Sequence, residues 1–163
     1  MIWLGISILY VCMFSPIIFA LISISRNPYI AYTGAGIMGL GLLLETIGDY
    51  QKSTFKKENP KLFCNTGLYK WVRCPNYFGE ILIWTGNLIV GISFFVGWWQ
   101  WLIALFGWIC IVLIMMGSTK RLEKKQLERY GEDPEFQKYI TSVPVLFPWL
   151  PIYSLAKVKV YLE

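Results

Sequence analysis

The stretch WWQWLIALFGWICIVLIMMG, residues 98–117, runs for twenty residues without a charged side chain. An α-helix of about 20 apolar residues crosses a hydrocarbon core about 30 Å thick. The aromatic residues at its start, Trp98, Trp99 and Trp101, are typical of a membrane–water interface. We therefore interpret this stretch as a membrane-spanning helix.

Three further apolar blocks precede it. They are residues 1–24, 29–48 and 77–95. Pro16 lies inside the first block and predicts a kink, which a spanning helix tolerates where neighbouring groups bond to the freed carbonyl. The second block carries four glycines between residues 34 and 41, which allow helices to approach closely. The blocks predict an all-α fold: a polytopic membrane helix bundle of about four transmembrane helices, forming a single membrane domain over residues 1–163.

The overall composition supports a membrane protein and argues against several site chemistries. Hydrophobic residues make up 56% of the chain and charged residues 15%, against about 25% charged in soluble domains. There is no histidine, and the four cysteines form no C-x-x-C pair. This pattern argues against a zinc site, a haem ligand or a histidine-dependent triad, so we expect no metal.

The distribution of basic residues predicts the orientation. Fourteen of the fifteen Lys and Arg residues lie in a loop at 49–76 and a tail at 118–163, which leaves Arg26 for the other side. The positive-inside rule then places loop and tail in the cytosol, with the chain in the endoplasmic reticulum or a bacterial inner membrane. The bases flank apolar blocks, so we expect them to face membrane lipids or an anionic cofactor, with no nucleic-acid partner.

The tail itself is predicted to be amphipathic. It begins with the helix-like sequence STKRLEKKQLERYG and passes through DPEFQKYI to the apolar, proline-containing sequence VPVLFPWLP at residues 143–151. We expect that last piece to lie against the membrane surface, because apolar and aromatic residues favour the interface.

Two carboxylates lie near the end of the second block. Glu45 and Asp49 are four residues apart, so both project from one face of a helix. An ionisable group at this depth is costly and points to a polar site for a ligand or a proton. The alternative is an interfacial acid paired with Lys52 or Lys56.

The segment RCPNYFGE, residues 73–80, leads into the third block. Asn76 and Glu80 are again four residues apart, with Tyr77 beside them, and would offer polar groups at the level of the acid pair. Alternatively, Asn76 caps the helix and Glu80 favours its positive end. Arg73 is the best placed base for a phosphate, because it lies beside a helix N-terminus.

Other bases, namely Lys56, Lys120 and Arg121, are candidates to join Arg73, or else serve only to set topology. Together these residues predict a polar pocket at the cytosolic end of the bundle, rimmed with positive charge. Such a pocket suits an amphiphilic substrate and an anionic cofactor, and the pattern leaves the cofactor unidentified.

Four motifs together resemble the C-terminal domain of the steroid 5-alpha-reductase family over roughly residues 34–151. They are E-x-x-x-D-x-Q-K-x-x-F-K from Glu45, G-L-Y-K-W-V-R-C-P-N-Y-F-G-E from Gly67, L-E-x-x-x-x-x-R-Y-G from Leu122 and F-P-W-L-P from Phe147. This family is related to the isoprenylcysteine carboxyl methyltransferase-like membrane superfamily.

The resemblance implies an NADPH-dependent membrane oxidoreductase that reduces a conjugated double bond of a lipid or steroid-like substrate. It implies that Glu45 and Asp49 contact the nicotinamide-ribose region and that Asn76 and Glu80 hold the carboxamide and ribose end. The other cofactor-binding residues that the resemblance implies are Lys56 near a phosphate, Tyr77 beside Asn76 and Glu80, and Arg121 and Glu123 in the closing helix. Arg73 remains a candidate from its place beside a helix N-terminus.

Two departures from the family pattern matter. Cys74 stands where the family commonly has histidine. The additional N-terminal spans that polarise the substrate carbonyl in the family are expected to be missing, so no catalytic residue is assigned. Hydride transfer to an enone needs charge stabilisation at the developing enolate oxygen. We therefore expect self-association or a partner that supplies the missing wall, or a different and smaller substrate.

Two other functions remain open. One is an S-adenosylmethionine-dependent enzyme like the isoprenylcysteine methyltransferases, which have a similar R-H-P-x-Y turn; the Glu45 to Lys56 motif argues against it. The other is a non-catalytic membrane scaffold that retains the fold.

Overall fold

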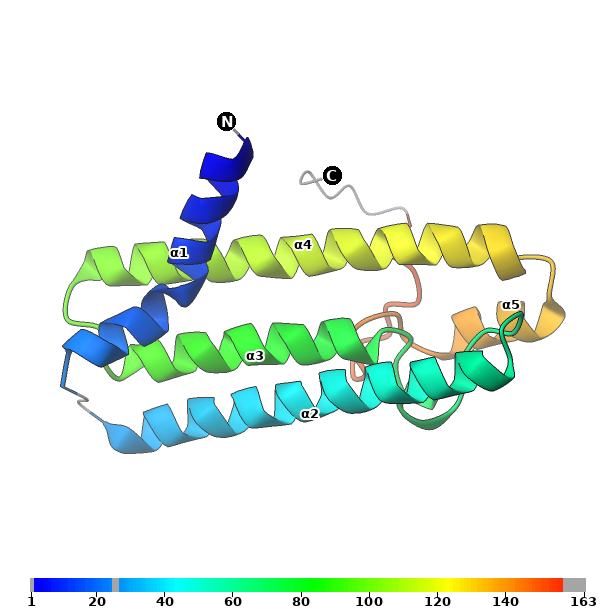
Figure 1. Cartoon of the computed structure of the whole chain (residues 1–163), viewed down its shortest axis with the longest axis horizontal. Coiled ribbons are helices and arrows are strands. Elements are labelled where there is room, and N and C mark those ends of the chain that lie inside the picture. Colours follow the sequence, from blue (N-terminus) through cyan, green and yellow to red (C-terminus); the bar gives the residue numbers. More distant parts are fainter. Residues whose placement is uncertain (1, 25–26, 157–163) are drawn as a thin grey trace. The chain divides into compact units, whose positions relative to one another are not determined.

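In the computed structural model the chain is all-α (Figure 1). The structure describes residues 2–24 and 27–156, so Arg26, used above to predict orientation, lies outside the described part. The elements are α1 (Ile2–Ile22), α2 (Pro28–Glu58), a 3-10 helix η1 (Gly67–Lys70), α3 (Pro75–Ile92), α4 (Trp98–Tyr130) and α5 (Pro134–Ser142). The predicted fold class is confirmed.

Three helices in the described part are long and apolar enough to cross a membrane. The three are residues Trp3–Ile22 of α1, the whole of α2 and the whole of α4. Together they indicate a membrane helix bundle. The block at 77–95 does form a helix, α3, but this helix carries Asn76, Glu80 and Asn87 and is not among the three. Its passage through the membrane stays a prediction.

Two helices continue well past the predicted spans. α2 has 31 residues and α4 has 33, which at about 1.5 Å per residue gives roughly 46 and 50 Å, against a hydrocarbon core of about 30 Å. Residues 49–58 of the predicted loop are therefore helical, as are residues 118–130 of the predicted tail. A change from apolar to charged composition marks where a helix leaves lipid, while Lys, Glu, Gln and Arg remain good helix formers.

The chain divides into two compact units, which we describe in turn. The first comprises Met1–Leu42 and Glu80–Leu113. Its core is the cluster Phe19, Leu88, Phe95 and Ala104. α1 is bent along its length (Figure 1) and contains Pro16, where a kink was predicted. The Ser15 hydroxyl donates to the Cys12 carbonyl at 2.8 Å, which satisfies the acceptor that proline leaves without a backbone donor.

Glycines in the first unit allow close helix contacts. A Cβ placed at Gly34 would lie 2.6 Å from the Gly86 carbonyl oxygen, so α2 and α3 pack backbone to backbone at this point. Gly34 thus has the role predicted for the small residues of the second block, whereas nothing lies within 4 Å of a Cβ at Gly36 or Gly39.

The second unit comprises Leu43–Gly79 and Ile114–Glu163. An aromatic cluster forms its core: the Phe63 ring lies 5.1 Å from Phe136 and 5.3 Å from Tyr139. Asp133 caps α5 by accepting a hydrogen bond from the Glu135 amide at 2.9 Å, and Pro134 occupies the first turn. The predicted tail is therefore a packed part of the fold up to residue 156.

The apolar end of the tail is divided between core and surface. Val145 and Leu146 are each 1% exposed, whereas Trp149 is 66% exposed. The Trp149 ring packs on Phe78 with a centroid distance of 5.2 Å. Whether this segment meets a membrane surface stays a prediction.

Candidate functional site

A buried ion pair fastens three segments of the second unit together. Arg73 Nη2 lies 3.0 Å from Glu123 Oε1, and the two residues are 2% and 3% exposed. Arg73 also donates to the Tyr153 carbonyl, and Glu123 accepts from the Leu155 amide at 2.9 Å. The pair therefore joins the start of α3, the α4 helix and the C-terminal segment.

This pairing involves two residues whose predicted cofactor roles stay predictions. Arg73 was expected to bind a phosphate and Glu123 to close the cofactor pocket, and the structure shows each engaged with the other. Two nitrogens of Arg73, Nε and Nη1, are nevertheless buried without a partner among the described residues. Buried donors are normally satisfied, so this guanidinium retains capacity for an anionic acceptor.

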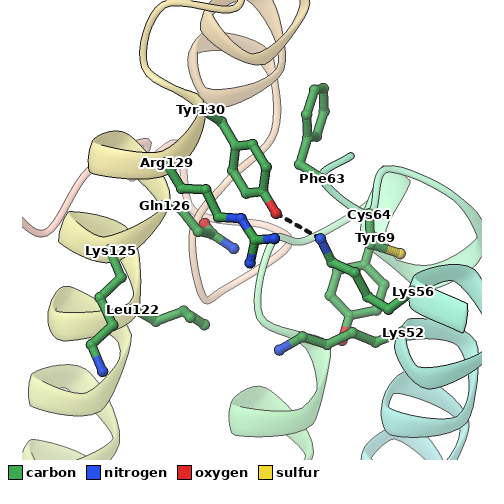
Figure 2. Close-up of a pocket in the computed structure, with 10 residues that line it drawn as sticks. All are labelled: Lys52, Lys56, Phe63, Cys64, Tyr69, Leu122, Lys125, Gln126, Arg129 and Tyr130. Atoms are coloured by element: carbon green, nitrogen blue, oxygen red, sulfur yellow. Dashed lines mark hydrogen bonds between the residues drawn. The ribbon is translucent and has the colours of Figure 1, made fainter. Parts of the chain in front are cut away.

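A pocket rich in positive charge lies in the same unit, and we call it the basic pocket (Figure 2). Its volume is about 230 Å³. The described residues that line it include four cations and no carboxylate. They are Lys52, Lys56, Phe63, Cys64, Tyr69, Leu122, Lys125, Gln126, Arg129 and Tyr130.

The basic pocket is built from α2, α4 and the segment that holds Phe63, Cys64 and Tyr69. α2 supplies Lys52 and Lys56, which are four residues apart, and α4 supplies the residues from Leu122 to Tyr130 (Figure 2). Lys56 Nζ donates to the Tyr130 hydroxyl at 2.6 Å and to the Leu62 carbonyl. The Arg129 guanidinium also lies 5.3 Å from the centre of the Tyr130 ring. Tyr130 thus positions two of the cations.

Tyr69, which lines the pocket, and the nearby Cys74 remain neutral at neutral pH. Burial raises the pKa of the Tyr69 phenol well above its ordinary value. Burial also raises the pKa of Cys74 to about 12, although Arg73 and Lys52 oppose the shift. Neither group supplies a negative charge at neutral pH, so the cations of the basic pocket remain available to an anion.

The acid pair lies close to the start of α3. Gly48, between Glu45 and Asp49, packs so tightly that a Cβ there would lie 3.2 Å from Pro75 Cγ and 3.4 Å from the Asn76 nitrogen. Glu45 is half-buried and Asp49 is exposed. The structure thus brings this part of α2 against Asn76, while Glu80 belongs to the first unit. The cofactor roles of these residues stay predictions.

A second pocket of about 250 Å³ lies along α4 and is lined by Tyr77, Ser118, Arg121, Leu122 and Lys125. We call it the α4 pocket. Arg121 Nη2 donates to the Ser118 hydroxyl at 3.2 Å. Of the predicted site residues, only Lys56 lines the basic pocket, whereas Tyr77 and Arg121 line the α4 pocket.

Sequence reasoning missed most of the basic pocket. Lys52 had been considered only as a partner for the acid pair, and the contributions of α4 were not identified. A signal was present, because Leu122, Lys125, Gln126 and Arg129 follow the i, i+3, i+4, i+7 spacing of a single helix face.

Comparison with known proteins gives a family. A family model described as "Protein of unknown function (DUF1295)" matches residues 1–143. The chain belongs to this family. Uncharacterized protein C594.04c of Schizosaccharomyces pombe is 35% identical over 88 residues, which is 54% of this chain and 24% of that protein. Uncharacterized protein C7D4.09c of the same yeast is 24% identical over 98 residues, or 60% of this chain and 34% of that protein.

The matches thus cover about a quarter and a third of these two relatives. No solved structure matches the chain significantly.

Proposed function

We propose that this protein is a membrane oxidoreductase that uses NADPH, with the phosphates of the cofactor held in the basic pocket. The observation that carries the proposal is the set of four cations, Lys52, Lys56, Lys125 and Arg129, without a carboxylate among the described lining residues. The resemblance of the NYFGE segment and the upstream acid pair to the steroid 5-alpha-reductase family supports the same cofactor.

The charge of the pocket favours a phosphorylated ligand. NADPH carries a diphosphate and a 2′-phosphate, and each cation near them contributes a charge-assisted hydrogen bond. S-adenosylmethionine has a sulfonium and an ammonium group against one carboxylate, so four cations would repel it. The electrostatics therefore support NADPH over the methyl donor.

The remaining polar residues fit the other end of such a cofactor. The Asn76 backbone packs near Gly48, between Glu45 and Asp49, and we propose that these three polar side chains hydrogen-bond an amide or a ribose. The unpartnered Nε and Nη1 of Arg73 offer donors to an anion. When bound, NADPH supplies a hydride, and the chain's own residues bind and orient it.

The proposed substrate is a lipid or steroid-like molecule with a conjugated double bond, because the cofactor site belongs to a membrane helix bundle. We place the basic pocket on the cytosolic side, in the endoplasmic reticulum or a bacterial inner membrane, since soluble NADPH must reach it. A group that stabilises the developing enolate oxygen is required, and the proposal leaves room for a partner or a second copy to provide it.

The test is a titration of the detergent-purified chain with NADPH, NADH or S-adenosylmethionine, in which the thermal stability of the chain is measured at each ligand concentration. A ligand that binds only the folded state stabilises it by about 2.7 kcal/mol at a hundredfold excess over its Kd. Stabilisation by NADPH that Lys56→Gln weakens and Lys57→Gln leaves intact supports the proposal, because Lys57 is exposed and does not line the pocket. Stabilisation by S-adenosylmethionine alone indicates a methyltransferase, and no stabilisation by any ligand indicates a scaffold.

A further inference from the structure

The α4 pocket combines positive charge, hydroxyl groups and one apolar side chain. Arg121 and Lys125 provide the charge, Ser118 and Tyr77 provide hydroxyls, and Leu122 provides the apolar contact. No carboxylate is among the described residues that line it. The hydrogen bond from Arg121 to Ser118 at 3.2 Å holds the guanidinium beside the hydroxyl. This donor set suits a phosphate ester.

The position of this pocket along α4 gives its depth. α4 begins at Trp98, its apolar stretch extends to Gly117, and its first charged residue is Lys120. The twenty residues 98–117 measure about 30 Å at a rise of about 1.5 Å per residue. That length equals the hydrocarbon thickness of a bilayer. Ser118 is thus the first residue past the core, and Arg121 and Lys125 follow about 5 and 11 Å further on.

The layer at this depth is that of the lipid headgroups. A bilayer measures about 40–45 Å with its headgroups, so each headgroup layer extends about 5–8 Å beyond the hydrocarbon. Arg121 falls inside this layer, and the backbone of Lys125 lies about 3 Å or more beyond it. Both are exposed, so a lipid phosphate can reach them from the side of the helix.

We propose that the α4 pocket binds the phosphate group of an anionic phospholipid. Arg121 and Ser118 bind the phosphate oxygens, Lys125 adds charge, and Leu122 provides an apolar contact within the headgroup layer. Free phosphate shares this chemistry, but the depth of the pocket commits the proposal to the lipid.

The lipid proposal can be tested separately from the cofactor proposed above, although Lys125 contributes to both pockets. The two pockets share Leu122 and Lys125, whereas Lys52, Lys56 and Arg129 line only the basic pocket and Ser118, Arg121 and Tyr77 only the α4 pocket. Variants of Arg121 and of Lys56 therefore separate the two sites.

The experiment is native mass spectrometry of the detergent-purified full chain with equal amounts of phosphatidylglycerol and phosphatidylcholine. Arg121→Gln is expected to lower the ratio of bound phosphatidylglycerol to phosphatidylcholine about fivefold, which corresponds to the attraction of one basic residue to an anionic surface. Lys124→Gln is the matched control, because Lys124 is exposed on the same helix and lines neither pocket. Ser118→Ala is a second variant, and its ratio should fall without a change in net charge.

Three results would overturn the proposal. Equal losses in Arg121→Gln and Lys124→Gln would show diffuse charge attraction. If Arg121→Gln and Ser118→Ala both leave the ratio of bound phosphatidylglycerol to phosphatidylcholine unchanged, the α4 pocket does not bind the lipid. Inorganic phosphate that raises thermal stability through Arg121, with no lipid preference, would assign the pocket to free phosphate. The lipid ratio of Lys56→Gln should remain that of the unmodified chain, so loss of NADPH binding leaves this test intact.

Discussion

Arg73 and Glu123 are fifty residues apart in the sequence, yet their side chains form an ion pair of 3.0 Å inside the second unit. Removing one partner of a buried pair leaves an uncompensated charge and costs about 3–5 kcal/mol. We therefore expect Glu123→Gln to lower the stability of the folded chain by this amount in a denaturant titration in detergent. Lys124→Gln, one residue further on the exposed face of α4, should change stability little.

The same pair shows why part of the site was not predictable. Residues 73 and 123 each carried a plausible cofactor role, and no local spacing relates residues separated by fifty positions. The spanning helices were predictable because each apolar block carries its own signal. The position at which α2 ends, Glu58, was not predictable, because charged residues can continue a helix as readily as they can begin a loop.

Gly67 predicts a specific loss of stability. It has a positive φ of 57°, and a Cβ there would lie 2.3 Å from the Gln51 side-chain oxygen, which also accepts the Leu68 amide at 2.8 Å. Gly67→Ala should destabilise the chain by about 1–2 kcal/mol through left-handed strain and loss of that bond. Gly36→Ala is the control, since nothing lies within 4 Å of its Cβ position. Equal melting temperatures for the two variants would contradict this account.

Cys74 predicts a dependence of stability on pH. Burial raises its pKa from 9.0 to about 12, so the unfolded chain loses this proton at lower pH than the folded chain. Stability therefore falls as pH rises between 9 and 12, by up to about 1.4 kcal/mol per pH unit. Cys74→Ala should flatten this decline, and thermal melting at increasing pH measures it. An equally steep decline in the variant would assign the effect to other groups, such as the buried phenols of Tyr69 and Tyr139, whose pKa values burial also raises.

The basic pocket predicts how cofactor binding responds to charge and salt. Arg129 lies over the Tyr130 ring, and Lys56 donates to the Tyr130 hydroxyl, so both cations are held beside the pocket. A hydrogen bond to a charged group contributes about 1.5–3 kcal/mol, so Arg129→Gln should weaken NADPH binding by at least about tenfold. The difference in NADPH affinity between Arg129→Gln and the unmodified chain should be smaller at high salt, because salt screens exposed charges.

Isothermal titration at two salt concentrations measures both effects, with Lys57→Gln as the control. Tyr130→Phe adds a sharper comparison: it retains the ring beneath Arg129 but removes the hydroxyl that accepts from Lys56. If Tyr130 positions Lys56, this variant should weaken NADPH binding while leaving the number of positive charges unchanged. An affinity equal to that of the unmodified chain would show that charge alone, rather than the positions of the cations, determines binding in this pocket.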